Sequence, residues 1–81
     1  MFDAREPSID ALRAAPVKFR YGSSKRRVLV DSFTASAILA VYDAANEENQ
    51  AKLSRMVAGT LDQFQRVAAF AFKVTSTHRT A

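Results

Sequence analysis

The 81-residue chain contains no cysteine and no tryptophan, and its one histidine, His78, lies close to the C-terminus. Without cysteine it cannot form a disulfide scaffold, a thiolate zinc site or a cysteine nucleophile, and one histidine makes no histidine cluster. Only two glycines are present, Gly22 and Gly59, so there is no glycine-rich phosphate loop. No apolar run approaches the 18 residues that a transmembrane helix needs. These absences remove most of the residue types from which catalytic and metal sites are built.

What is present is typical of one small globular domain. The apolar share is 48%, the charged share is 25%, and twelve Lys and Arg against eight Asp and Glu give a net charge of +4. The first seven residues include Asp3, Glu6 and Pro7, unlike a secretory signal. The composition therefore predicts a protein that acts in the cytoplasm.

Residues 17–30 have the pattern of a β-hairpin. The segment 17–21 alternates apolar and basic side chains, as expected of a half-buried strand. Gly22 and the polar residues after it suit a turn, and 27–30 is rich enough in β-branched residues for a return strand. The preceding residues, 1–16, contain two prolines and no sustained periodicity, and we expect a flexible N-terminal segment.

Three helices are predicted after the hairpin, over about 34–45, 47–58 and 61–74. The candidate N-caps are Asp31, Ser32 or Thr34 for the first helix, Asn46 for the second and Thr60 for the third. Gln63 completes a capping box with Thr60, and Gly59 suits the end of the second helix. The predicted fold class is α+β, mainly helical: one compact domain over 17–75, consisting of the hairpin and a three-helix bundle, with a flexible tail over 76–81.

The first predicted helix has small side chains opposite its main apolar stripe. Ala37, Ala40 and Ala44 occupy this side, where a surface helix would carry charges. Two interpretations fit. The helix is either central in its own domain, with neighbours on both sides, or it forms a subunit interface through these alanines.

The third predicted helix also has one apolar residue out of place. Phe70 falls outside its apolar stripe and lies beside Arg66 and Lys73. An aromatic side chain flanked by cations suits contact with another chain, whereas the alternative is that Phe70 packs under the N-terminal segment or the hairpin. A core of this size gives little net stability without a disulfide or metal, so we expect a homo-oligomer, most simply a two-fold dimer.

Catalytic candidates are poor. His78 lies in the tail, and Glu47 and Glu48 are adjacent in sequence, so they point in different directions and suit the first turn of a helix. Asp31 and Asp43 have no obvious acidic or metal-binding partner. The sequence predicts a protein that is not an enzyme and has no cofactor and no metal.

Nucleic-acid binding is the alternative function. The hairpin region carries a cluster of cations: Lys18, Arg20, Lys25, Arg26 and Arg27. Such side chains neutralise phosphates, and a two-stranded ribbon fits a major groove. Residues 53–61 also resemble a degenerate helix-turn-helix, although the helix that follows is more apolar than a recognition helix. Against this, Phe19 and Tyr21 share a face with Val17 and suit anchoring of the hairpin to the helices.

The segment 28–49, VLVDSFTASAILAVYDAANEEN, resembles small uncharacterised proteins of actinobacteriophages, especially mycobacteriophages, and the similarity continues more loosely through 52–73. The resemblance covers about two-thirds of the chain, and its most distinctive segments are TASAI and VYDA. It implies a phage origin and action in the cytoplasm of the bacterial host. It carries no catalytic residues over. Small phage proteins of this kind act by binding a host protein or by assembling with themselves.

Together these observations predict a non-enzymatic interaction module that self-associates, binds a host protein, or does both, with no membrane partner. The predicted contact residues are Ala37, Ala40, Ala44, Arg66, Phe70 and Lys73. The alternative is a small basic DNA-binding protein that uses the hairpin or the degenerate helix-turn-helix.

Overall fold

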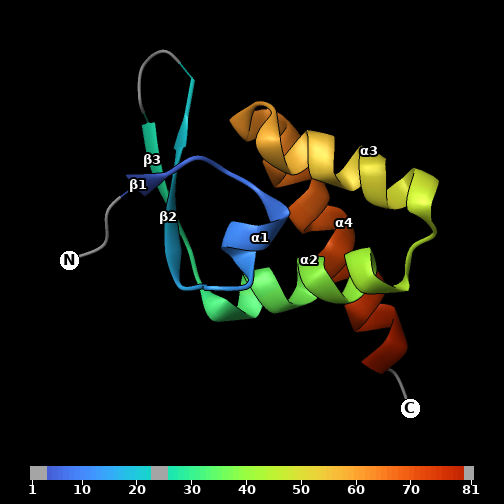
Figure 1. Ribbon diagram of the computed structural model, residues 1–81. Helices are drawn as coiled ribbons and strands as arrows, with labels where there is room; N and C mark the ends of the chain where they lie inside the picture. The colour runs from blue at the N-terminus through green and yellow to red at the C-terminus, as the bar shows by residue number, and fades with distance from the viewer. Residues whose placement is uncertain (1–3, 23–25, 80–81) are drawn as a thin grey trace.

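The computed structural model describes residues 4–22 and 26–79 and has a small sheet at one end and helices at the other (Figure 1). The elements are, in order, β1 (Ala4–Arg5), α1 (Ile9–Leu12), β2 (Val17–Tyr21), β3 (Arg26–Val30), α2 (Ser32–Ala44), α3 (Glu47–Ala58) and α4 (Leu61–Arg79). The predicted fold class, α+β and mainly helical with the sheet before the long helices, is confirmed.

β2 and β3 form the predicted hairpin. They pair antiparallel, with Val17 opposite Val30 and Tyr21 opposite Arg26. Gly22 has a φ of 72°, a value that side chains disfavour, so it allows the chain to leave β2 and turn. Val17, Phe19 and Tyr21 are buried, which confirms that this face of the strand anchors the hairpin to the helices.

The part of the N-terminal segment that the structure describes, residues 4–16, differs from the flexible segment expected. β1 adds a third strand parallel to β2, and the sheet order is β1–β2–β3. α1 follows, and the Ser8 hydroxyl caps it by accepting a hydrogen bond from the Ala11 N–H. Ile9 and Leu12 are buried in the core. These elements are too short to show periodicity, and they depend on contacts with residues far along the chain.

Polar side chains cap the three long helices as expected. The Thr34 N–H donates to Asp31 Oδ1 at 2.7 Å, so Asp31 is the cap of α2, and the helix begins two residues before the predicted start. This hydrogen bond lowers the pKa of the Asp31 carboxyl. The Asn49 N–H donates to Asn46 Oδ1 at 2.9 Å at the start of α3. Each cap satisfies a backbone donor that the helix itself leaves free.

Thr60 and Gln63 form a reciprocal capping box at the start of α4. The Gln63 N–H donates to Thr60 Oγ1 at 3.1 Å, and the Thr60 N–H donates to Gln63 Oε1 at 2.9 Å. We expect Thr60→Ala to lower the free energy of unfolding by about 1 kcal/mol, because the cap loses its acceptor. Urea denaturation measures the change. Ser36→Ala, at an exposed position inside α2, is the control, and an equal loss in both variants contradicts the role of the box.

α4 runs to Arg79, five residues past its predicted end at 74. The tail expected over 76–81 is therefore helical through 79, and residues 80–81 fall outside the described part. The Thr75 hydroxyl donates to the carbonyl oxygens of Ala71 at 2.9 Å and Phe72 at 3.2 Å. A threonine hydroxyl can form its hydrogen bonds to backbone carbonyls of its own helix, so the Thr- and Ser-rich composition does not end α4.

The core lies between the inner face of the sheet and the helices. α4 packs against both α2 and α3, and Figure 1 shows it crossing these two helices on its way to the C-terminus. Phe19, Tyr21 and Phe64 form an aromatic cluster with ring centroids 5.9–6.1 Å apart. Ile38 and Val57 are fully buried beside them. The sheet is therefore joined to all three long helices by one core.

Candidate functional site

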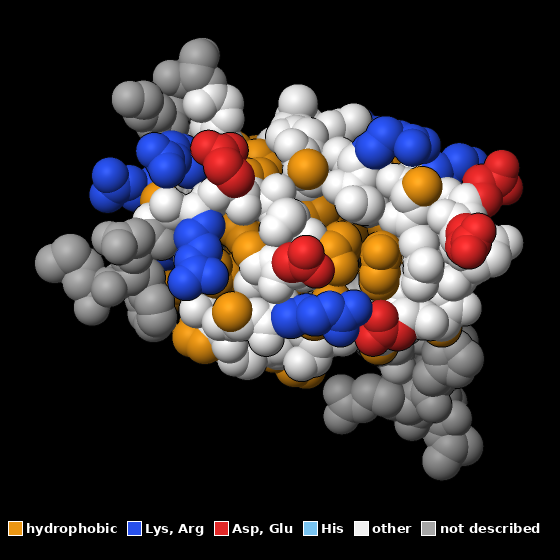
Figure 2. Space-filling view, in the orientation of Figure 1, with side chains coloured by type: hydrophobic (Ala, Val, Ile, Leu, Met, Phe, Trp, Pro, Cys, Tyr) orange, Lys and Arg blue, Asp and Glu red, His pale blue; other side chains and the backbone are white. Residues whose placement is uncertain are grey.

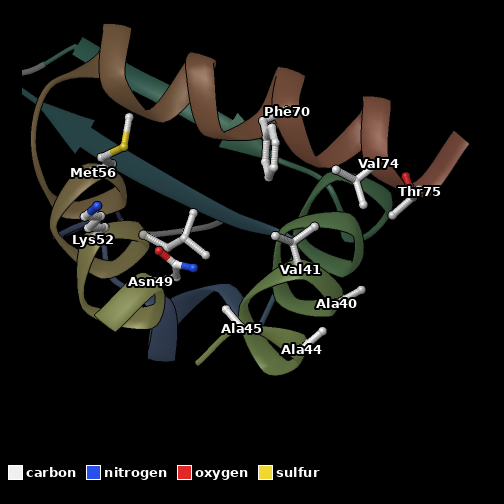
Figure 3. Close-up of a pocket in the computed structure, with 11 residues that line it drawn as sticks. Ala40, Val41, Ala44, Ala45, Asn49, Lys52, Met56, Phe70, Val74 and Thr75 are labelled. Atoms are coloured by element: carbon white, nitrogen blue, oxygen red, sulfur yellow. The ribbon is translucent and has the colours of Figure 1, made fainter. Parts of the chain in front are cut away.

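A groove of about 560 Å³ opens between α2, α3 and α4 (Figure 3). Its walls come from all three helices: Ala40, Val41, Ala44 and Ala45 from α2, Asn49, Lys52, Leu53 and Met56 from α3, and Phe70, Val74 and Thr75 from α4. The lining is apolar except for Asn49, Lys52 and Thr75, and Lys52 is its one charged residue. The volume falls within the range of pockets that bind small molecules or side chains of a partner.

Small side chains on α2 leave this space unfilled. Ala40 and Ala44 lie one helical turn apart on the groove side of the helix, and Ala45 follows at its end. α2 and α3 diverge from their short connection, as Figure 1 shows. The Gln50 amide donates to the Tyr42 carbonyl oxygen at 2.9 Å and ties the two helices together at this connection. The groove is therefore the space between diverging helices whose facing side chains are too small to close it.

Phe70 forms part of the groove and is 53% exposed. Figure 3 shows its ring projecting from α4 into the space between α2 and α3. Its described neighbours in the groove come from α2, α3 and α4, and not from the N-terminal segment or the hairpin, the alternative that the sequence left open. Arg66 and Lys73 are exposed one turn on either side of it, and Arg66 Nε donates to Asp62 Oδ2 at 2.9 Å.

The three alanines predicted as one contact face are divided by the structure. Ala40 and Ala44 are exposed and line the groove, whereas Ala37 is 8% exposed and belongs to the core of its own chain. The buried residues of α2 all lie between Ala35 and Ile38. The first half of α2 is thus central in its own domain, as one interpretation predicts, and its second half is exposed along the groove. The subunit interface of the other interpretation stays a prediction.

The catalytic candidates are dispersed. Asp31 caps α2, and Asp43 accepts a hydrogen bond from Arg13 at 3.0 Å in an exposed ion pair that raises the pKa of the guanidinium. Glu47 and Glu48 lie in the first turn of α3. Among the described residues, no three acidic, histidine or cysteine side chains lie close enough to hold a metal ion. The side chain of His78 lies outside the described part.

The cations of the hairpin do not form a single surface. Lys18 and Arg20 alternate with the buried residues of β2 and so lie on the outer face of the sheet, as does Arg27, which is opposite Arg20. Arg26 is opposite the buried Tyr21 and therefore lies on the inner face, at the exposed end of the hairpin. Lys25 lies outside the described residues. Figure 2 shows Lys and Arg side chains over the sheet end of the molecule and a second group over the end that carries α3.

The segment 53–61 does not present a free recognition helix. It consists of the end of α3, the connection at Gly59 and Thr60, and the start of α4. Leu53 lines the groove and Val57 is buried, while α4 packs against both neighbouring helices. Phe64, in the second turn of α4, is buried in the core. This part of the chain contributes side chains to the core and to the lining of the groove.

Comparison with protein-family models found no matching family, and neither the curated proteins nor the solved structures gave a match. No helix within the described residues has the length and apolar character required to cross a bilayer.

Proposed function

We propose that this protein is a non-enzymatic interaction module whose contact surface is the groove between α2, α3 and α4. The observation that carries the proposal is Phe70, a half-exposed aromatic side chain in a groove whose other lining is mainly apolar. Aromatic side chains in apolar pockets dominate the energy of many protein interfaces. The walls formed by Ala40 and Ala44 let a partner's side chain approach the backbone of α2 closely.

Self-association is the simplest use of this surface. A two-fold dimer through the groove would cover Phe70 in both copies and enlarge a core that is small for a domain without disulfides or metals. It would also bury Val74 and Met56, which the groove leaves half-buried.

A charged side chain placed in the groove tests this proposal. We expect wild-type protein to sediment as a dimer at micromolar concentration and Ala44→Arg to sediment as a monomer, because a buried guanidinium without a partner is unfavourable at an interface. Ala44 is exposed, so the folded monomer tolerates the change. Ala51→Arg, at an exposed position of α3 outside the groove, is the matched control. A monomeric wild type contradicts self-association.

A protein of the bacterial host is the second class of partner, as the resemblance to actinobacteriophage proteins implies. Affinity purification from a mycobacterial lysate, with wild-type protein and Phe70→Ala side by side, separates the two uses of the groove. Recovery of the protein alone supports assembly with itself. A host protein that is recovered by wild type and by Ala51→Arg, but lost with Phe70→Ala and Ala44→Arg, supports host binding.

A further inference from the structure

The outer face of the sheet carries cations that the groove does not use. The hairpin register places Arg20 opposite Arg27 and Lys18 opposite Leu29. Directly opposed residues have Cβ atoms about 4.5–5.5 Å apart, so the two arginines are close neighbours on the same face. Lys18 is two residues from Arg20 along β2 and shares that face. Three cations therefore lie together on the outer face of β2 and β3.

Within the described residues these three cations have no ion-pair partner. Like charges directly opposite each other on two strands are destabilising. Among the ion pairs found in the described part of the chain, none involves Lys18, Arg20 or Arg27. The nearest acid after β3 is Asp31, whose carboxylate caps α2. A bound anion would relieve the repulsion between these cations.

Arg20 is also incompletely satisfied. Its Nη2 donates to the Ala4 carbonyl oxygen at the long distance of 3.3 Å, and its Nε is buried with no hydrogen-bond partner among the described residues. The contact with β1 holds the guanidinium against the sheet, and no ion pair of Arg20 with an acid is found among the described residues. Arg20 is thus a positioned cation rather than a freely moving one.

Exposed apolar side chains lie close to the cations along the chain. Leu29 is 59% exposed opposite Lys18. Phe33 is 65% exposed in the first turn of α2, four residues further on, and its ring stacks on Phe72 with centroids 5.6 Å apart and planes 18° apart. The stacking fixes one face of the Phe33 ring against the protein. Phe33 lies three residues past the end of β3, at the end of the hairpin where Lys18 is opposite Leu29. Cations together with a fixed aromatic ring are the combination on which single-stranded nucleic acids bind, by phosphate contacts and base stacking.

We propose that the outer face of the sheet binds single-stranded nucleic acid, with Lys18, Arg20 and Arg27 contacting phosphates and Phe33 stacking on a base. A single strand fits better than a duplex because only unpaired bases present their faces to an aromatic ring. A duplex would use the cations alone. This surface is separate from the groove, so the proposal is independent of the interaction proposed there.

Fluorescence anisotropy with the full chain and a labelled oligothymidine tests the charge component. We expect salt-dependent binding to the single strand. The double variant Lys18→Gln with Arg27→Gln should lower the slope of log affinity against log salt by about 1.4, since each phosphate contact on a single strand contributes about 0.7. The control is Arg13→Gln with Arg55→Gln, which removes two exposed cations outside the sheet and the groove. An equal fall in both double variants would mean that only net charge matters and would overturn the proposal.

The stacking component is tested with Phe33→Leu, which keeps an apolar contact with Phe72 and removes the flat ring. Affinity for the oligothymidine should fall about five- to a hundredfold, as for other stacked bases. Tyr42→Leu, which removes a half-buried aromatic ring of α2 outside the groove, should bind as wild type. Circular dichroism confirms that each variant is folded. Two outcomes reject the proposal: a duplex of the same length bound as tightly as the single strand, or binding to anionic phosphatidylserine vesicles without binding to the oligonucleotide.

Discussion

Phe19→Ala should lower the free energy of unfolding by about 3–5 kcal/mol, the usual cost of removing a fully buried aromatic ring. Phe19 is 0% exposed at the centre of β2. Its ring meets those of Tyr21 and Phe64 edge-on, at centroid distances of 6.1 and 5.9 Å. Edge-to-face pairs add to the energy of burial itself. The substitution therefore leaves a cavity where the sheet meets α4.

The expected loss is comparable to the total stability that a core of this size provides. Phe19→Ala should therefore be largely unfolded at 25 °C without stabilising solutes, whereas Phe70→Ala, at a half-exposed position, should stay folded. Urea denaturation followed by circular dichroism, with both variants and wild type in the same stabilising osmolyte, gives both values. A loss below about 1 kcal/mol for Phe19→Ala would show that the neighbouring rings collapse into the space and that the aromatic cluster does not hold the sheet.

Local signals in the sequence were sufficient for the long helices and the hairpin. Asp31, Asn46 and the pair Thr60 and Gln63 each cap the helix predicted for them, because capping depends on residues only two or three positions apart. The alternation over 17–21 likewise marked the buried face of β2. These features required no knowledge of the rest of the chain.

Features that depend on distant contacts were missed. β1 exists because Ala4 and Arg5 pair with Lys18 and Phe19, and two residues carry no pattern of their own. α4 passes its predicted end because the Thr75 hydroxyl bonds inside the helix, whereas a Thr- and Ser-rich run is typical of a loop. In both cases the periodicity of apolar residues in the sequence carries no information about the interaction that decides the structure.

The candidate groove was predicted in part. Ala40, Ala44 and Phe70 stood out because each breaks the pattern of its helix, and all three line the groove. Lys52 gave no such signal, since a cation on the exposed side of a helix is ordinary. Its place in the groove follows from the angle between α2 and α3, which the core fixes. Ala37, one turn before Ala40, is enclosed because α2 meets the core along its first half.

For the outer face of the sheet, the sequence indicated only that the hairpin carries a cluster of cations. The register separates that run, with Arg20 and Arg27 together on the outer face and Arg26 on the inner one. Phe33 gave no signal, because an aromatic residue in the first turn of a helix is expected to pack inward. Its exposure and its stacking on Phe72 require the crossing of α2 with α4.

Tyr21 joins the sheet to α3 through a buried hydrogen bond. Its hydroxyl donates to the Val57 carbonyl oxygen at 2.8 Å. Val57 lies in the last turn of α3, which ends at Ala58, so this carbonyl has no partner within the helix. Tyr21 therefore satisfies a carbonyl in the last turn of α3 and fixes this end of the helix against the hairpin. Burial favours the neutral phenol and raises the pKa of Tyr21 well above its ordinary value.

This raised pKa predicts a loss of stability in alkaline solution. The unfolded chain releases the Tyr21 proton near its ordinary pKa of about 10, while the folded protein retains it. The contribution of Tyr21 is therefore fully present below pH of about 10 and decreases as pH rises further, by about 1.4 kcal/mol per pH unit from this group. Urea denaturation at pH 8 and at several alkaline values measures the slope.

Tyr21→Phe separates this effect from the titration of other groups. At neutral pH the variant should lose about 1 kcal/mol or more, because the Val57 carbonyl is left buried without its donor. Above pH of about 10 its stability should fall less steeply than that of wild type, because no phenol remains at this position to titrate. Tyr42→Phe, on half-buried α2 surface, retains Tyr21 and should keep the full slope. Parallel alkaline slopes for wild type and Tyr21→Phe would show that the phenol ionises within the fold and that its hydrogen bond does not hold α3 to the sheet.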